Sequence, residues 1–187
     1  PNLESYATAE AAGDDRALFN GVNRTLDNDD VATFKSGFGV AKFTNFKTDG
    51  SAGHDATFPD ADFFLMRAAE AYLNFAEADA RINGGQTTKE GTEAINAIRK
   101  RANASPREDK GYSLNDICDE WSREFYFEGR RRMDLIRFNR FGGNVNYNWQ
   151  WKGGTKEGRN FSKDLNIFAI PTNELTSNKN LIQNPGY

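Results

Sequence analysis

The sequence predicts a mainly α-helical fold of tetratricopeptide-like helix pairs, flanked by long irregular loops and short β segments. Apolar residues recur at helical spacing in three stretches between residues 59 and 141. Glycine pairs and capping residues separate these stretches, as they do at the ends of helices. Turn-forming residues dominate on both sides of this region. We therefore divide the chain into a loop-rich segment at 1–57, a helical core at 59–141, and loops with an extended tail at 142–187.

The loop-rich segment is expected to hold little regular structure. Between residues 34 and 46 the apolar positions are irregularly spaced, which predicts at most a short strand with a bulge. Asp27, Asp29 and Asp30 could suggest calcium, but the late bidentate Glu of a calcium-binding loop is missing. We interpret these three residues as an acidic turn.

The helical core should open with two antiparallel helices. The first is expected to begin after Pro59, which suits the first turn of a helix, and to end at the glycine-rich stretch 83–85. The second should begin at Thr87 or Thr88, and Thr87 with Glu90 fits a capping box. The short linker between them predicts a helical hairpin.

A third and longer helix should begin at Ser113, with Asp116 three residues further on, and run to about Phe138. At this length the helix would span about 38 Å. Gly129 interrupts the apolar stripe and should mark a bend or a close helix crossing. We expect one continuous helix over 113–138.

Three glutamates spaced four residues apart, Glu120, Glu124 and Glu128, lie on one ridge of this helix. Like charges at this spacing repel one another, so an isolated helix would not favour them. Arginines of the first two helices are the expected partners, and Arg132 stands four residues after Glu128 as a favourable pair. The predicted salt-bridge network consists of Arg67, Arg99, Arg101, Glu124, Glu128, Arg132 and Asp134.

The same glutamates could instead be the acid/base pair of a glycosidase, because carboxyl groups one helical turn apart can satisfy the required separation. That chemistry needs the two groups on opposite sides of the bond that is cleaved, whereas these share one ridge. Neighbouring arginines would also lower the pKa of the proton donor, which is the wrong direction for a general acid. We expect no catalytic residue here.

The composition argues against several classes of function. The net charge of −3 disfavours general affinity for nucleic acid, and no apolar run reaches the roughly 20 residues of a membrane span. Cys118 is the only cysteine, so neither an intrachain disulfide nor a cysteine-based zinc site can form. His54, the only histidine, lies in a glycine-containing loop and should be solvated. We expect no metal and no cofactor.

A candidate binding segment lies at 144–154, where aromatic side chains alternate with polar ones. Alternation predicts a strand or hairpin arm with the aromatic rings on one face. Such rings can stack on the C–H faces of pyranose sugars while the amides receive the hydroxyl groups. The alternative is a hairpin packed against the long helix, which would bury this face. The candidate ligand-binding residues are Tyr147, Asn148, Trp149 and Trp151.

The last residues, 170–187, are polar and carry a proline near each end. Proline blocks helix continuation, and Asn and Gly favour turns, so a terminal helix is not expected. We predict an extended tail laid over a globular surface and fixed by Leu181 and Tyr187.

Four motifs, in chain order, resemble those of the SusD/RagB family of outer-membrane nutrient-binding lipoproteins. The matching stretches are residues 67–78, 94–102, 119–137 and 183–187, with weaker echoes at Asp15-Arg16 and Lys42-Phe43. Phe125 is one departure, because leucine is commoner there, but it keeps the apolar character. The resemblance covers about residues 14–187 and assigns no role to residues 147–151.

The resemblance implies a SusD-like fold and a surface protein without catalytic activity. Such proteins are lipid-anchored on the extracellular face of the outer membrane, capture glycans or sometimes peptides, and cap a TonB-dependent, SusC-like transporter. The family's lipid-modified cysteine is not Cys118, which sits in mid-helix. Because the chain starts without Met or a signal peptide, we expect it to be the carboxyl-terminal part of a longer protein. The alternatives are a tetratricopeptide-type scaffold that binds peptide in its concave face and, less favoured, a glycoside hydrolase.

Overall fold

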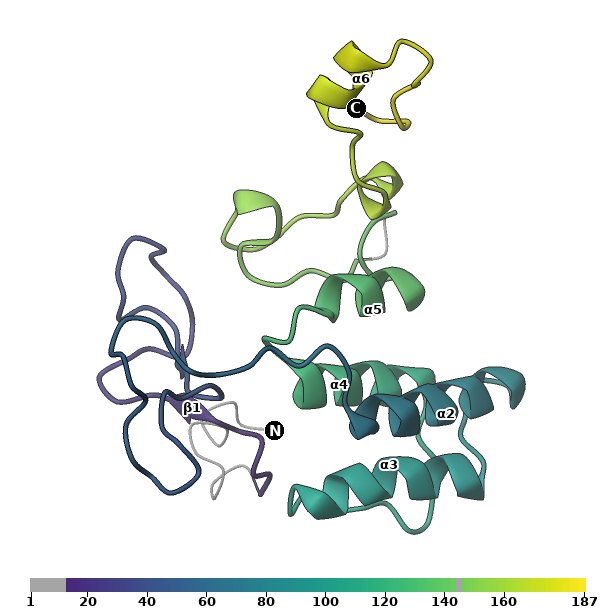
Figure 1. Ribbon diagram of the computed structural model, residues 1–187. Helices are drawn as coiled ribbons and strands as arrows, with labels where there is room; N and C mark the ends of the chain where they lie inside the picture. Colours follow the sequence, from purple (N-terminus) through teal and green to yellow (C-terminus); the bar gives the residue numbers. More distant parts are fainter. Residues whose placement is uncertain (1–12, 144–145) are drawn as a thin grey trace. The chain divides into compact units, whose positions relative to one another are not determined.

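The computed structural model describes residues 13–143 and 146–187 and is mostly helical, as the sequence predicts (Figure 1). The chain forms two compact units, one up to Gly129 and one from Arg130 onward. The division of the sequence into three segments stays a prediction. Within the described ranges, none of the helices has the length and apolar character that crossing a membrane requires.

From residue 13 to residue 67, the first unit consists of irregular chain and one small sheet. β1 (Phe19–Asn20) pairs antiparallel with β2 (Gly39–Val40), and Phe19 lies opposite Val40. The short strand predicted within 34–46 is therefore confirmed.

The acidic residues near position 30 are exposed in irregular chain. The backbone N–H groups of Asp29 and Asp30 both donate to Ser36 Oγ, at 2.7 and 2.9 Å. His54 is also exposed, with 78% of its side chain accessible, and it contacts Asp60. Across residues 13–143 and 146–187, no cluster of three or more His, Cys, Asp or Glu side chains could hold a metal ion.

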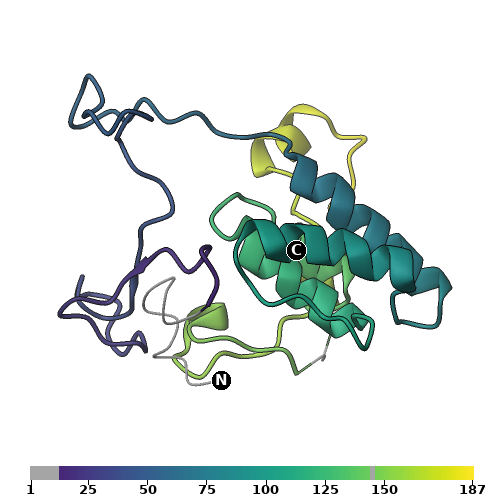
Figure 2. The ribbon, with the colours of Figure 1, turned by 90° about the horizontal axis from the view of Figure 1, so that it is seen from below.

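Three helices form the core of the first unit. α2 (Ala68–Ile82) and α3 (Lys89–Arg101) form the predicted antiparallel hairpin, and α4 (Leu114–Phe125) packs against α2 (Figures 1 and 2). Small side chains on α2 let its neighbours approach closely, and larger apolar side chains fill the space between the helices. The buried apolar residues include Leu73, Ala76, Ala80, Ile95, Ile98, Ile117, Trp121 and Phe125.

The first helix ends at Ile82, next to the predicted glycine stretch, but it begins at Ala68 rather than after Pro59. Asp60 is tied to the preceding loop instead. Its N–H donates to Asn45 Oδ1 at 3.0 Å, and its carboxylate accepts from the N–H of His54 at 2.9 Å. The apolar side chains at 63–66 are exposed. Residues before Ala68 therefore have no buried apolar face that would stabilise an earlier start of the helix.

The capping box predicted at Thr87 and Glu90 is wrong. α3 begins after Thr88, whose side chain makes no capping hydrogen bond within its own helix. The N–H and hydroxyl of Thr88 instead donate to the carboxylate of Asp79 in α2, at 2.7 and 2.9 Å. The short linker brings this carboxylate to the start of α3, and an ionised acceptor forms the stronger hydrogen bond.

The predicted start of the third helix is confirmed. Ser113 Oγ accepts from the N–H of Asp116 at 3.2 Å, and the Asp116 carboxylate accepts from the N–H of Ser113 at 2.8 Å, which completes a capping box. A β-bridge between Gln86 and Ser113 places this start beside the linker of the helical hairpin.

The prediction of one continuous helix over 113–138 is wrong. α4 ends at Phe125, and a separate helix, α5 (Arg131–Arg137), follows after a turn. In this turn Phe127 and Gly129 have φ angles of 59° and 74°. A right-handed helix cannot contain left-handed residues, so the chain breaks here instead of bending.

The second unit contains α5, the short 3-10 helices η2 (Lys152–Gly154) and η3 (Lys163–Asn166), and α6 (Thr172–Ser177). The strand or hairpin arm predicted at 144–154 is wrong for the described residues 146–154. Trp151 has a φ of 65°, in the left-handed region. The aromatic side chains therefore do not alternate across one strand.

The prediction of a fully extended tail is also wrong. Pro171 directly precedes the helix α6, in keeping with the preference of proline for helix starts. Leu181 and Tyr187 are 38% and 51% exposed, so their burial does not fix the tail.

Polar side chains fix the tail instead. The Gln183 amide accepts from the N–H of Ile170 at 2.8 Å and donates to its C=O at 2.9 Å. The Tyr187 hydroxyl donates to the C=O of Ile167 at 2.8 Å. The family-like ending thus closes the tail back on the segment before α6.

Candidate functional site

The three glutamates of the predicted ridge are buried: Glu120 is 0% exposed, Glu124 2% and Glu128 8%. The first two belong to α4, and Glu128 lies in the turn after it. A buried carboxylate is costly unless it is paired and hydrogen-bonded. Each of these three is held by at least two cationic side chains.

Glu120 lies at the inner end of the network. Its Oε2 is 2.8 Å from Arg99 Nη1 and 2.7 Å from Arg123 Nη2, and its Oε1 is 2.8 Å from Arg16 Nη1. These cations come from α3, from α4 itself and from the chain before β1. The pairs tie all three segments to one carboxylate.

Glu124 is surrounded in the same way. Its Oε1 is 2.8 Å from Arg67 Nη1, and its Oε2 is 2.7 Å from Arg101 Nη2 and 3.2 Å from Arg16 Nη1. Arg67 precedes α2, and Arg101 ends α3. The structure therefore brings both helices of the hairpin to the same glutamate.

Glu128 receives a forked pair from Arg67, with Nε 2.7 Å from Oε2 and Nη2 2.8 Å from Oε1. Lys42 Nζ lies 2.6 Å from the Oε1 of Glu128. The Arg67 guanidinium also stacks 4.2 Å from the ring centroid of Phe125. A planar guanidinium can do all of this at once, whereas a lysine could not.

Arg16 and Lys42 were not among the residues predicted for the network. Both lie in the loop-rich segment, where no helical periodicity indicates a position in the core. The only signal in the sequence is the weaker resemblance at Asp15-Arg16 and Lys42-Phe43. In the structure these two residues hold the loop-rich segment against α4.

Charge pairing decides the ionisation of Glu120 and Glu128. Burial by itself would raise the pKa of Glu120, but the surrounding guanidinium groups, Arg123 first, outweigh it and lower the pKa. Burial also opposes the shift at Glu128, where hydrogen bonds from Arg67 and Lys42 lower the pKa. These two carboxylates are thus held in their charged form.

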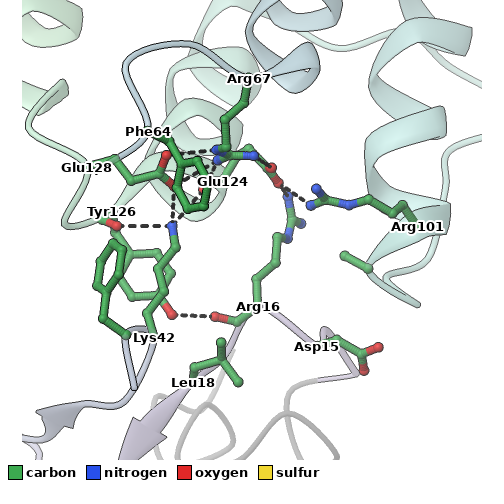
Figure 3. Close-up of a pocket in the computed structure, with 12 residues that line it drawn as sticks. Asp15, Arg16, Leu18, Lys42, Phe64, Arg67, Arg101, Glu124, Tyr126 and Glu128 are labelled. Atoms are coloured by element: carbon green, nitrogen blue, oxygen red, sulfur yellow. Dashed lines mark hydrogen bonds and ion pairs between the residues drawn. The ribbon is translucent and has the colours of Figure 1, made fainter. Parts of the chain in front are cut away.

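A cavity of about 400 Å³ opens beside the network, between the loop-rich segment and the helices (Figure 3). Its polar wall is already engaged within the protein. Lys42 Nζ, for example, donates to the C=O of Glu124 at 2.9 Å, the C=O of Tyr126 at 3.1 Å and the carboxylate of Glu128 at 2.6 Å. Because these groups satisfy one another, the network holds segments together and leaves little for a ligand.

The same geometry argues against the glycosidase alternative. A general acid needs a raised pKa, whereas the pKa of Glu128 is lowered. Glu124 and Glu128 also share the guanidinium of Arg67, which leaves no space for a scissile bond between them.

Two residues predicted for the network belong to the second unit. Arg132 Nη2 donates to the C=O groups of Leu165 and Asn166, at 2.8 and 3.2 Å. Asp134, which is 1% exposed, pairs with Arg137 Nη2 at 2.9 Å. The predicted contact between Glu128 and Arg132 requires both residues to lie one turn apart on the same helix. The chain leaves the helix between α4 and α5, so the two residues do not have this helical spacing.

The predicted ligand-binding residues differ in their exposure to solvent. Trp149 is 39% exposed and Asn148 is exposed, whereas Tyr147 and Trp151 are half-buried. The rings of Tyr147 and Trp149 meet edge to face, with centroids 6.4 Å apart. The Tyr147 hydroxyl accepts from Arg131 Nη2 at 2.9 Å. Of the three aromatic residues, Trp149 is the most exposed.

Comparison with known proteins identifies the family to which this chain belongs. The chain matches the model of the SusD family over residues 5–187. It is 43% identical over 182 residues to the starch-binding protein SusD of Bacteroides thetaiotaomicron, a match that covers 95% of this chain and 32% of that protein. The chain therefore spans about a third of the length of this curated relative.

Solved structures show the same fold. A SusD superfamily protein from Parabacteroides distasonis superposes with a TM-score of 0.64 at 21% identity, over 99% of this chain and 41% of that one. The surface glycan-binding protein A from Bacteroides uniformis gives a TM-score of 0.62 at 24% identity, over 92% of this chain and 38% of that one. The chain belongs to the SusD family.

Proposed function

We propose that this chain is part of a protein that binds glycans at the cell surface without cleaving them. The observation that carries this proposal is the 43% identity, over nearly the whole chain, to a starch-binding member of the same family. The lowered pKa of Glu128 and its engagement by Arg67 and Lys42 support a binding role over an acid-catalysed one.

The family membership also supports a location and a partner. We propose that the protein lies on the extracellular face of the outer membrane, held there by a lipid anchor. There it would deliver oligosaccharide or polysaccharide to a TonB-dependent transporter of the SusC type. Co-purification of such a transporter with the protein from detergent-solubilised outer membranes tests this part.

Within this chain, Trp149 is the best candidate for a sugar contact. Trp149 is 39% exposed, and the exposed residue Asn148 is next to it in the sequence. An accessible ring beside a hydrogen-bonding side chain is the combination that a pyranose requires, with one apolar face and peripheral hydroxyl groups. Tyr147 and Trp151 are proposed to support this contact, because both are half-buried.

The test uses the protein as the cell makes it. Native gels containing starch or other soluble polysaccharides measure retardation, and hence affinity, while a reducing-end assay on the same mixtures detects cleavage. We expect retardation by at least one glycan without release of reducing ends, and an affinity about tenfold lower for Trp149→Ala. Val22→Ala, which changes an exposed apolar residue of the first unit, is the control.

Three results would count against the proposal. Failure of every polysaccharide to retard the protein would refute glycan binding. Release of reducing ends that is lost in Glu128→Gln would support the hydrolase alternative. Unchanged affinity in Trp149→Ala would remove this residue from the site and leave the rest of the proposal in place.

A further inference from the structure

Lys152 is a buried cation at the centre of the loop that carries Trp149. The residue is 2% exposed. Its ammonium group donates to the C=O of Tyr147 at 2.8 Å and lies 4.7 Å from the ring centroid of Trp149 and 5.0 Å from that of Phe161. Within the described part of the chain it forms no ion pair, unlike the buried cations of the first unit.

A buried ammonium without a carboxylate partner is costly. Burial accordingly lowers the pKa of Lys152. Aromatic faces recover part of the cost, because their negative quadrupole attracts a cation. An apolar side chain of similar length would fill this space without the cost, so the position calls for a role that depends on the amine.

The backbone is folded tightly around this side chain. The N–H of Lys152 donates to the C=O of Trp149 at 3.1 Å, and the N–H of Arg159 donates to the C=O of Lys152 at 3.1 Å. Gly158, with a φ of 73°, passes so close that a Cβ there would lie 2.3 Å from the oxygen of Trp149. The loop therefore closes on itself, with the ammonium inside and Trp149 at its edge.

We propose that Lys152 is a positioning residue for glycan recognition, which holds one face of the Trp149 indole and the C=O of Tyr147 so that the exposed part of the indole meets the sugar. This inference rests on the proposed function. It adds a buried residue, out of reach of the ligand, to the determinants of affinity.

The physical basis is preorganisation. Sugar stacking is weak, so a ring that must first be ordered loses part of the binding free energy. The Lys152 ammonium contacts the indole ring and the main chain at Tyr147, and so fixes the ring relative to the loop. A methionine would fill much of the space, but it could not donate to the C=O of Tyr147.

A double-mutant cycle tests this role with native-gel affinity for the polysaccharide that retards the wild-type protein most. Lys152→Met should weaken binding about tenfold in the wild-type background and less than about twofold in Trp149→Ala, because the lysine acts through the indole. Lys152→Arg, which keeps a cation, should retain more affinity than Lys152→Met. Lys179→Met, at an exposed position of the same unit, should bind like wild type.

Several outcomes overturn the inference. Wild-type affinity in Lys152→Met refutes it, although glycan binding by the protein would still stand. If Lys152→Met lowers the affinity equally in the wild-type and Trp149→Ala backgrounds, the lysine has only a general structural role. The same conclusion follows if Lys152→Met and Lys152→Arg weaken binding equally. If Trp149→Ala has no effect on affinity, the indole through which Lys152 is proposed to act does not contact the glycan, and the inference fails. If the wild-type protein binds no glycan, the proposed function is refuted as well.

Discussion

At the scale of single residues, Arg67 joins three parts of the first unit. It precedes α2, yet its guanidinium donates to two buried glutamates and stacks on Phe125. One side chain thereby connects the start of the hairpin to α4 and to the turn that follows.

Replacement of Arg67 by methionine should lower the free energy of unfolding by about 3 kcal/mol, because it leaves buried carboxylates short of a partner. The loss of unfolding free energy should stay near the lower end of the range for a broken buried ion pair, because both glutamates keep other cationic partners. Glu124 keeps Arg16 and Arg101, and Glu128 keeps Lys42. Urea unfolding followed by circular dichroism measures the change.

Lys89→Met is the matched control, because Lys89 forms an exposed pair with Glu93 at 3.9 Å. Pairs of this kind contribute little to stability, so this variant should unfold like the wild type. Equal stability of the two variants would show that the buried pairs of Arg67 are not stabilising.

At the scale of elements, the network fastens a loop-rich segment to a helical layer. Arg16 and Lys42 reach α4 and its following turn from residues 13–57, whose described regular structure is limited to β1 and β2. Among the apolar residues described at 13–57 only Ala17 is buried, so we expect the attachment to depend largely on the ion pairs. The attachment should therefore respond to pH.

Acidification should detach this segment and destabilise the first unit. The pKa values of Glu120, Glu128 and Asp14 are lowered in the folded protein, each because cationic partners outweigh burial. Their stabilising effect is complete above the unfolded pKa of about 4 and is lost as pH falls through the lower folded values. The free energy of unfolding, measured by urea titration from pH 6 to pH 2.5, should fall steadily.

Asp134, in the second unit, has the opposite effect on the pH dependence of stability. Burial raises its pKa more than Arg137 lowers it, so protonation favours its folded state. Asp134→Asn should therefore leave the acid-induced loss in the first unit unchanged. A flat or rising stability of the protein below pH 4 would contradict the assignment of the network as the acid-sensitive element.

The sequence predicts elements whose signal is local. The hairpin of α2 and α3 follows from apolar periodicity and a glycine linker, and the start of α4 follows from the capping pair Ser113 and Asp116. The break after α4 could not be predicted in this way. It requires a left-handed Phe127, and phenylalanine gives no sign of that conformation.

Part of the salt-bridge network was predictable, because the spacing of its glutamates is also a local signal. Repeating glutamates on one ridge require cations, and the neighbouring helices offered Arg67, Arg99 and Arg101. Arg16 and Lys42 come from irregular chain, where spacing carries no information about distance. Their roles depend on tertiary contacts that a single sequence does not specify.

At the scale of the whole molecule, we expect the first unit to provide a stable helical core and the second unit to provide the glycan contacts. Ion pairs hold the helical layer and the loop-rich segment of the first unit, and their polar groups are largely satisfied by one another. The accessible ring of Trp149 lies in the second unit, on a loop built around Lys152. We expect glycan contacts on that loop and not on the helical hairpin.

Hydrogen exchange followed by mass spectrometry, with and without an oligosaccharide of the polysaccharide that binds best, tests this central claim most directly. The account predicts slower exchange of backbone amides in residues 147–159 and no change in α2, α3 and α4. Protection confined to α2 and α3 would support a peptide-binding helical scaffold instead. That result, or unchanged exchange at residues 147–159 when the ligand is bound, would contradict the account.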